Sequence, residues 1–207
     1  MFGFNIAEAL RLIVGLLVAI TVHEASHAYW AYRLGDPTPK ALGRVTLNPI
    51  AHLDPLGTVM MLVAAISGFG FGWGKPVPVN PFYLRRFGPK TGMAIVSVAG
   101  PASNLVVAGL LLLPLRLDLV PTLVVAQFLL SVAWVNVFIA LFNLIPIPPL
   151  DGFSVLLGVL PTRIGASLAQ LQQYGPMLLL LLVFAGMRWL GPTMASGALA
   201  IIRLYLG

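Results

Sequence analysis

Two histidines and a glutamate occur at a spacing that is typical of metal-dependent hydrolysis. Residues 23–27 have the sequence HEASH, which fits the pattern H-E-x-x-H. On a helix, residues four apart lie on one face, so His23 and His27 can reach a single metal ion. Glu24 can then approach a water molecule at the metal and act as a general base. Zinc suits this set, because two imidazoles and a carboxylate leave a fourth position open.

The surroundings of this motif argue against a chance match. H-E-x-x-H is short, and on a soluble protein the simplest explanation is an exposed helix surface. Here the motif lies in a largely apolar stretch, 5–34, of a chain with only 3 histidines and 6 acidic residues. Burying such groups costs several kcal/mol unless they are paired or bind a metal. The sequence therefore predicts a metal site.

A third protein ligand must come from another acidic residue. Glu8 is about four turns away on the same predicted helix and cannot reach. Asp151 is the strongest candidate, because it follows the uncharged run 119–150 and an isolated carboxylate at the end of a membrane helix is a candidate functional group. A simple helix cap or an interfacial acid remains the alternative for Asp151.

The elements that position these residues are predicted to be membrane helices. The chain is 59% hydrophobic and 9% charged, with a mean hydropathy of +0.97, whereas soluble domains carry about 25% charged residues. Uncharged runs at 91–115, 119–150 and 164–187 are each long enough for the roughly 20 residues of a spanning helix. We expect an all-α polytopic membrane protein with about four to five transmembrane helices, in one membrane-embedded metalloprotease domain, 1–207.

The motifs together resemble the site-2 protease family of intramembrane zinc metalloproteases, in particular its short prokaryotic branch without PDZ or CBS domains. The resemblance covers roughly residues 20–155. It is carried by the H-E-x-x-H motif, Gly100-Pro101-x-x-Asn104, Asn143-x-x-Pro146 with Leu150-Asp151-Gly152, the stretch from Asn48 to Gly57, and Lys75 to Pro81. It implies that His23, His27 and Asp151 bind one Zn²⁺, that Glu24 is catalytic, and that Asn143 lies near the reacting carbonyl or the substrate backbone.

A shared zinc ion constrains the topology. The two histidines lie late in their helix, and Asp151 follows the end of its own, so the two helices must run in the same direction with one opposite span between them. The apolar segment 56–72 must then enter and leave on one side. Its glycines and the Pro-rich stretch 75–81 suit a re-entrant segment with short extended strands, which is tolerated where it lines a protein cavity. We expect Gly100 and Asn104 to serve helix packing and interhelical hydrogen bonding.

The basic residues favour one orientation. Under this topology eight of the 12 fall on one side, which is then cytoplasmic. They are Arg33, Lys40, Arg44, Lys75, Arg85, Arg86, Lys90 and Arg163. We expect the cell membrane of a prokaryote, with the active site in the cytoplasmic half. The net charge is +6, but the basic residues do not alternate with aromatic residues as in a nucleic-acid-binding groove. Nucleic acid is therefore not an expected partner.

The expected function is hydrolysis of peptide bonds in transmembrane or membrane-associated protein substrates, as in regulated intramembrane proteolysis. Asn143 would hydrogen-bond the oxyanion or the substrate backbone, and the extended segment could pair with an unwound substrate. His52 is a candidate gate or temporary ligand, although a lone loop histidine is more often interfacial. An ion-coupled transporter that uses the His/Glu/Asp cluster is the main alternative, and a scaffold with structural zinc is a second. The sequence does not indicate an oligomeric state.

Overall fold

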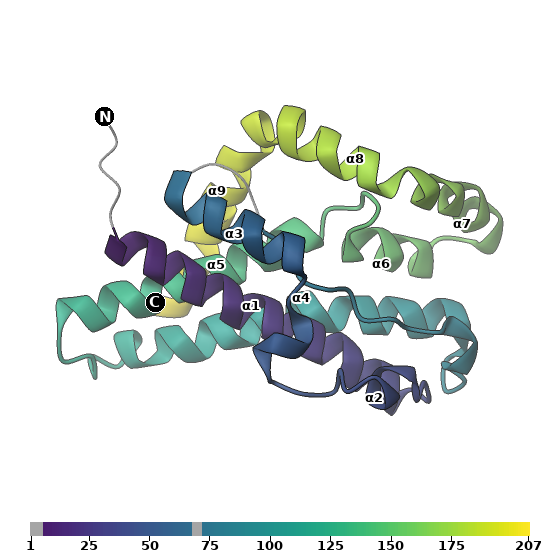
Figure 1. The fold of residues 1–207 in the computed structure, drawn as a ribbon, viewed down its shortest axis with the longest axis horizontal. Helices are drawn as coiled ribbons and strands as arrows, with labels where there is room; N and C mark the ends of the chain where they lie inside the picture. The colour runs from purple at the N-terminus through teal and green to yellow at the C-terminus, as the bar shows by residue number, and fades with distance from the viewer. Residues whose placement is uncertain (1–5, 68–71) are drawn as a thin grey trace.

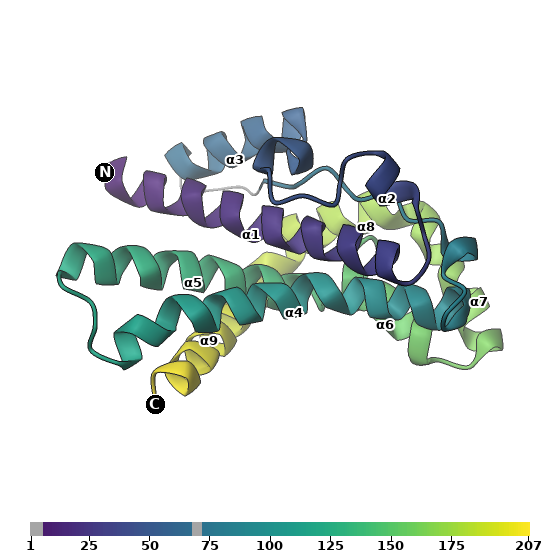
Figure 2. The same ribbon diagram turned by 90° about the horizontal axis from the view of Figure 1, so that it is seen from below.

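Three long helices form the centre of the protein. The computed structural model describes residues 6–67 and 72–207. Helices α1 (Ile6–Arg33), α4 (Gly88–Arg116) and α5 (Leu123–Asn143) pack side by side (Figures 1 and 2). All three are long and apolar enough to cross a membrane, and a fourth candidate span is the helical stretch Thr162–Gly186. The expected polytopic all-helical architecture is confirmed.

The directions of these helices match the predicted topology. Arg11 of α1 contacts Gln127 of α5, and further along both helices Gly15 lies against Val135, so α1 and α5 run in the same direction. His27 contacts the Val96 carbonyl early in α4, while Ala19 contacts Asn104 later in α4, so α4 runs the opposite way. The parallel pair with one antiparallel helix between it brings the C-terminal halves of α1 and α5 to a similar depth.

The connection from α1 to α4 is re-entrant in the described residues. After α2 (Thr38–Ala41) and the 3-10 turn η1 (Pro49–His52), helix α3 (Pro55–Ser67) packs against α1. Its 13 residues span only about 20 Å, which is shorter than a hydrocarbon core of about 30 Å. Leu53 and Gly74 form an antiparallel bridge, so the chain returns to the level at which α3 began. Of the expected glycine cluster, Gly68 and Gly70 lie outside the described residues.

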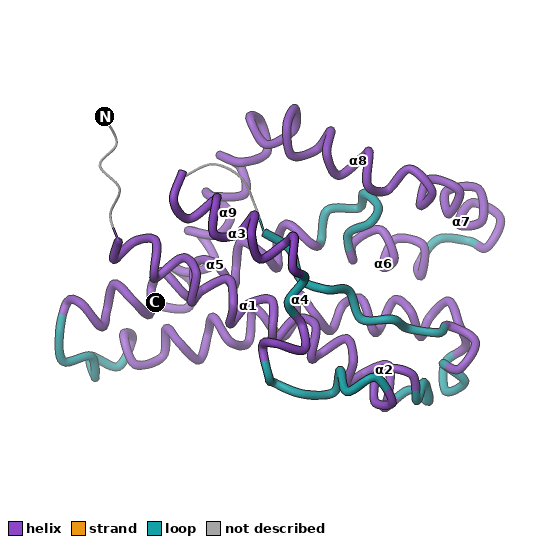
Figure 3. Tube along the Cα trace, in the orientation of Figure 1, coloured by secondary structure: helices purple, strands orange, loops and turns teal. Residues whose placement is uncertain are grey.

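The expected short strands are reduced to that single bridge. Residues 75–80 are extended, as their prolines predict, but no β-strand forms among the described residues (Figure 3). Pro76 and Pro78 have no N–H for a ladder, which limits pairing to isolated contacts. After the short turn η2 (Pro81–Tyr83) the chain enters α4.

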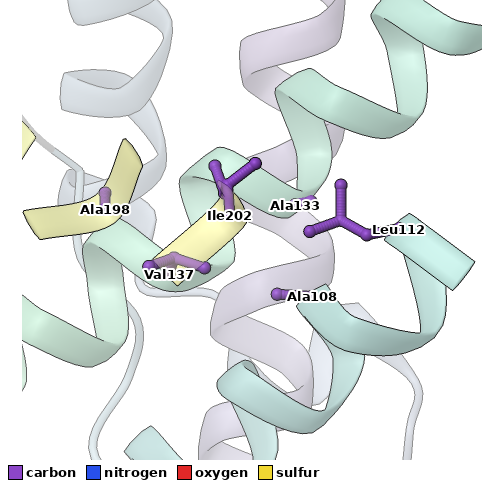
Figure 4. Close-up of a cluster of buried hydrophobic side chains, with 6 residues drawn as sticks. All are labelled: Ala108, Leu112, Ala133, Val137, Ala198 and Ile202. Carbon is purple, nitrogen blue, oxygen red and sulfur yellow. The ribbon is translucent and has the colours of Figure 1, made fainter. Parts of the chain in front are cut away.

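The C-terminal part differs from the expected boundaries. Helices α6 (Asp151–Val159) and α7 (Thr162–Ala169) lead through η3 (Gln170–Tyr174) to α8 (Gly175–Leu181). A π-helical turn, η4 (Leu182–Gly186), separates α8 from α9 (Met187–Leu206). The uncharged run 164–187 and the apolar residues after it predict a span near 173–190 and a short apolar segment at 193–206. The break instead falls at the π-helical turn, and α9 packs on α4 and α5 through a core of Ala108, Leu112, Ala133, Val137, Ala198 and Ile202 (Figure 4).

Candidate metal centre

Three side chains that are far apart in the sequence converge inside the protein. His23 and His27 lie one turn apart on α1, and Asp151 is the first residue of α6. Asp151 Oδ2 lies 2.9 Å from His23 Nε2 and 3.2 Å from His27 Nε2. Both histidines are buried and Asp151 is half-buried. The structure therefore brings together the three residues that the sequence singled out as metal ligands.

The local sequence after α5 explains how Asp151 reaches this place. Pro146, Pro148 and Pro149 end the helix and turn the chain back, because proline cannot donate a helical N–H. Gly152 then packs against the Leu144 carbonyl so closely that an added Cβ would overlap it. The start of α6 is thereby held against the end of α5, which carries Asp151 to the histidines.

Hydrogen bonds on the far side of each imidazole determine which ring nitrogen faces Asp151 as an acceptor. His27 Nδ1 lies 2.7 Å from the Val96 carbonyl oxygen, and His23 Nδ1 lies 2.7 Å from Asn104 Oδ1. Both partners accept hydrogen bonds, so each Nδ1 donates its N–H. In the neutral imidazoles the two Nε2 atoms then carry lone pairs and face the Asp151 carboxylate.

This arrangement fits a bound zinc ion. Two nitrogen lone pairs and a carboxylate oxygen meet at one point, and they lie within 4.8 Å of one another. Within the described part of the chain, Asp151 Oδ2 is a buried oxygen with no hydrogen-bond donor. A proton on one imidazole would satisfy one contact, whereas a divalent cation satisfies all three acceptors. Two imidazoles and one carboxylate are a common ligand set of catalytic zinc, with a fourth position left open.

Helix α4 forms the wall behind the two histidines. A Cβ added to Gly100 would lie 2.5 Å from His27 Cε1 and 2.7 Å from His23 Cε1, so only glycine leaves room for both rings. Asn104 is fully buried one turn further along, where it contacts His23. The expected interhelical hydrogen bonding of Asn104 is confirmed, but sequence reasoning missed that its partner is a candidate metal ligand. The spacing of four residues, which puts Gly100 and Asn104 on one helix face, was the available signal.

Glu24 is held by the extended segment that follows the re-entrant helix. Its Oε2 accepts a hydrogen bond of 3.1 Å from the Val77 N–H. The buried Arg44 donates to the Lys75 and Pro76 carbonyls and so fixes the same segment from the other side. Burial lowers the pKa of Arg44 and the nearby Glu24 carboxylate opposes that shift. The segment therefore lies directly beside the candidate general base.

Two further predicted site residues lie at the edges of this region. His52 is fully buried, and its Nε2 donates to the Thr46 carbonyl at 2.8 Å, while its own carbonyl accepts the Lys75 N–H at 2.7 Å. Asn143 is the last residue of α5, and its Nδ2 donates to the Ile139 carbonyl at 3.0 Å. Neither side chain is part of the described group of three candidate ligands.

Comparison with known proteins agrees with this geometry. Residues 118–184, which include Asp151, match peptidase family M50. The chain is 39% identical over 204 residues to a candidate zinc metalloprotease, YwhC of Bacillus subtilis, with 94% of the chain and 90% of the relative covered. It is 33% identical to candidate zinc metalloproteases named Rip2, over 176 residues in Mycolicibacterium smegmatis and 177 in Mycobacterium tuberculosis.

These two matches cover 83% and 84% of the chain and 66% of each relative. No solved structure matches the chain significantly. The long match to YwhC, together with the family match around Asp151, is sufficient to assign the family. The chain belongs to peptidase family M50, the site-2 protease family of intramembrane zinc metalloproteases.

Proposed function

We propose that this protein hydrolyses peptide bonds of transmembrane or membrane-associated proteins at the site formed by His23, His27, Asp151 and Glu24. The single observation that carries the proposal is the convergence of two imidazole acceptors on Asp151 Oδ2, which has no hydrogen-bond donor among the described residues, in a bundle of membrane helices. In this proposal the first three residues hold one Zn²⁺, and Glu24 moves the proton.

Each residue has a distinct task in the reaction. Zinc, when bound, polarises the scissile carbonyl and makes water a stronger acid. Glu24 takes the proton of the attacking water and gives it to the leaving nitrogen. Its Oε2 already accepts the Val77 N–H, which orients the carboxylate. Asn143 donates one hydrogen of Nδ2 to the Ile139 carbonyl, and the second, which no described contact uses, is available to the substrate oxygen or backbone.

The extended segment 75–80 offers a surface for an unwound substrate. A helical substrate must open before cleavage, because its peptide groups are internally hydrogen-bonded. Lys75, Val77 and Asn80 already use their N–H groups within the protein, and Arg44 donates to the carbonyls of Lys75 and Pro76. Among the described contacts, the Val79 N–H and the carbonyl oxygens of residues 77–79 are left for pairing with a substrate. His52, the candidate gate, would act through this segment, because its carbonyl holds the Lys75 N–H.

We place the protein in the cell membrane of a prokaryote, as one membrane-embedded domain over 1–207, with the site in the cytoplasmic half. The support is the distribution of basic residues at the end of the bundle where α1 ends and α4 begins. Arg33 ends α1, Lys90 in the first turn of α4 donates to the Leu160 carbonyl, and Arg44 and Lys75 lie in the connection between these two helices. Cytoplasmic loops carry such an excess of Lys and Arg.

A Glu24→Gln variant tests the proposal. The purified protein should keep its zinc, measured by metal analysis, while cleavage of a model single-span substrate disappears. Glu8→Gln is the matched control on the same helix, far from the site, and it should cleave like the wild type. Cleavage by Glu24→Gln at the wild-type rate, or wild-type protein without zinc, would reject the proposed chemistry.

A further inference from the structure

A chain of hydrogen bonds crosses three helices and ends on one of the proposed zinc ligands. It begins at the Val132 carbonyl of α5, which accepts a bond of 2.8 Å from Asn136 Nδ2. Asn136 Oδ1 in turn accepts a bond of 3.0 Å from Asn104 Nδ2 on α4. Asn104 Oδ1 lies 2.7 Å from His23 Nδ1 on α1. Both asparagines are fully buried, so water does not compete for these contacts.

The orientation of each amide in this chain follows from its partners. The Val132 carbonyl only accepts, so Asn136 must point its nitrogen toward it and its oxygen toward Asn104. Asn104 must then present its nitrogen to Asn136, and the same nitrogen donates to the Ala19 carbonyl at 2.9 Å. With both N–H groups used, Asn104 has only its oxygen left for His23.

From this order of donors and acceptors we infer that Asn104, oriented by Asn136, is a positioning residue that keeps the proton of His23 on Nδ1 and leaves Nε2 free to bind zinc. With the proton on Nε2, the Asn104 oxygen would face a lone pair of Nδ1 in a buried site, and the metal-facing nitrogen would be blocked. His27 needs no such residue, because its Nδ1 donates to the Val96 backbone carbonyl. The inference rests on the proposed zinc ligands.

The inference also gives the Gly100-Pro101-x-x-Asn104 stretch a specific task. Gly100 leaves the space in which both imidazoles fit, and Asn104 fixes the ring state of one of them. Partners of this kind, behind a metal-binding histidine, fix its tautomer and its ring orientation. Asn104 does not itself touch the reacting atoms, so its loss should act through zinc binding.

The test measures how fast the zinc-loaded full-length protein loses zinc to a chelator. Asn104→Ala removes the acceptor and should speed zinc loss roughly 10- to 100-fold. Asn136→Ala should speed it less, since Asn104 still holds its bond to Ala19. Ser103→Ala is the matched control, because Ser103 lies beside Asn104 and the described contacts of its hydroxyl are with the Gly100 and Val22 carbonyls.

Asn104→Asp separates positioning from a purely structural role. Aspartate keeps an oxygen for His23 but loses both N–H donors that tie α4 to α1 and α5. If Asn104 acts as an acceptor, this variant should hold zinc more tightly than Asn104→Ala. Equal rates of zinc loss in the two variants, or a wild-type rate in a folded Asn104→Ala, would overturn the inference. If Asn104→Ala does not fold, Asn136→Ala becomes the test. A wild-type rate of zinc loss in Asn136→Ala would also overturn the inference.

A His23→Ala reference distinguishes this inference from the proposed function. If His23→Ala still binds zinc like the wild type, the proposed ligand set itself is wrong. If His23→Ala loses zinc but Asn104→Ala does not, only the role assigned to Asn104 fails.

Discussion

Val77 donates its backbone N–H to Glu24 Oε2 at 3.1 Å, and this bond joins the proposed general base to a segment 53 residues away in sequence. Arg44 fixes the same segment through two carbonyls, and the buried Asp36 accepts the Asn80 N–H at 2.6 Å at its far end. The position of the Glu24 carboxylate therefore depends on how this segment is anchored.

Replacing Val77 by proline tests that dependence. Val77→Pro removes the N–H while keeping extended backbone between Pro76 and Pro78. A hydrogen bond to a charged group contributes about 1.5–3 kcal/mol, so cleavage of a model substrate should slow roughly 10-fold or more. Zinc content should not change, because no proposed ligand is altered. Val77→Ala keeps the N–H and serves as the control, and equal cleavage rates in the two variants would contradict the assigned role.

The metal site could be predicted from the sequence because most of its residues are neighbours in the chain. His23, Glu24 and His27 lie within five residues on one helix, and an apolar context makes such a cluster costly without a metal. The prediction of Asp151 as a ligand required a further argument about topology, because two helix ends must lie at equal depth to share an ion. The bridge between Leu53 and Gly74 agrees with the re-entrant segment that this step demanded.

Asp151→Asn tests the third ligand directly. The amide is a poorer zinc ligand than the carboxylate, so zinc content should fall from about one ion per chain to near zero, and cleavage should stop. Metal analysis of the purified variant measures this. Asp118→Asn is the control, because Asp118 lies in the α4–α5 connection at a positive φ that asparagine also tolerates. An Asp151→Asn protein that retains full zinc would show that Asp151 is only a helix-terminal acid.

Arg44→Ala tests how the extended segment is anchored. Removing the guanidinium leaves the Lys75 and Pro76 carbonyls without their donor, at a cost of about 1–3 kcal/mol. We expect a lower melting temperature and a higher KM for a model substrate, with zinc content unchanged. The control is Lys40→Ala in the same connection, where the described contacts of the exposed ammonium are with the hydroxyl and the ring of Tyr32. If Arg44→Ala has the KM and melting temperature of the wild type, Arg44 does not anchor the extended segment.

The contacts behind the histidines could not be read from the sequence. Asn104 and Asn136 meet because the rotation of α4 and α5 about their axes turns both residues toward each other and toward His23 in the buried centre. Periodicity predicts that each is on a helix, but it does not determine the rotation of three apolar helices whose sides are nearly all hydrophobic. The boundary before α9 was also misplaced, because the apolar sequence of Leu182–Gly186 does not show that the helix breaks there.

Gly100→Ala distinguishes a glycine required by the site from one that is merely tolerated. An alanine Cβ would lie 2.6 Å from His27 Nε2, so one imidazole must move away from the position that faces Asp151. Zinc content and cleavage should both fall, whereas Gly→Ala in a helix otherwise stabilises by about 0.5–1 kcal/mol. Gly197→Ala on α9 is the matched control, since its nearest neighbour would be Leu141 Cδ1 at 3.5 Å, an ordinary contact. It should keep zinc and melt at the same or a higher temperature. If Gly100→Ala behaves like Gly197→Ala in metal analysis and in melting, α4 does not define the space in which the two histidines meet.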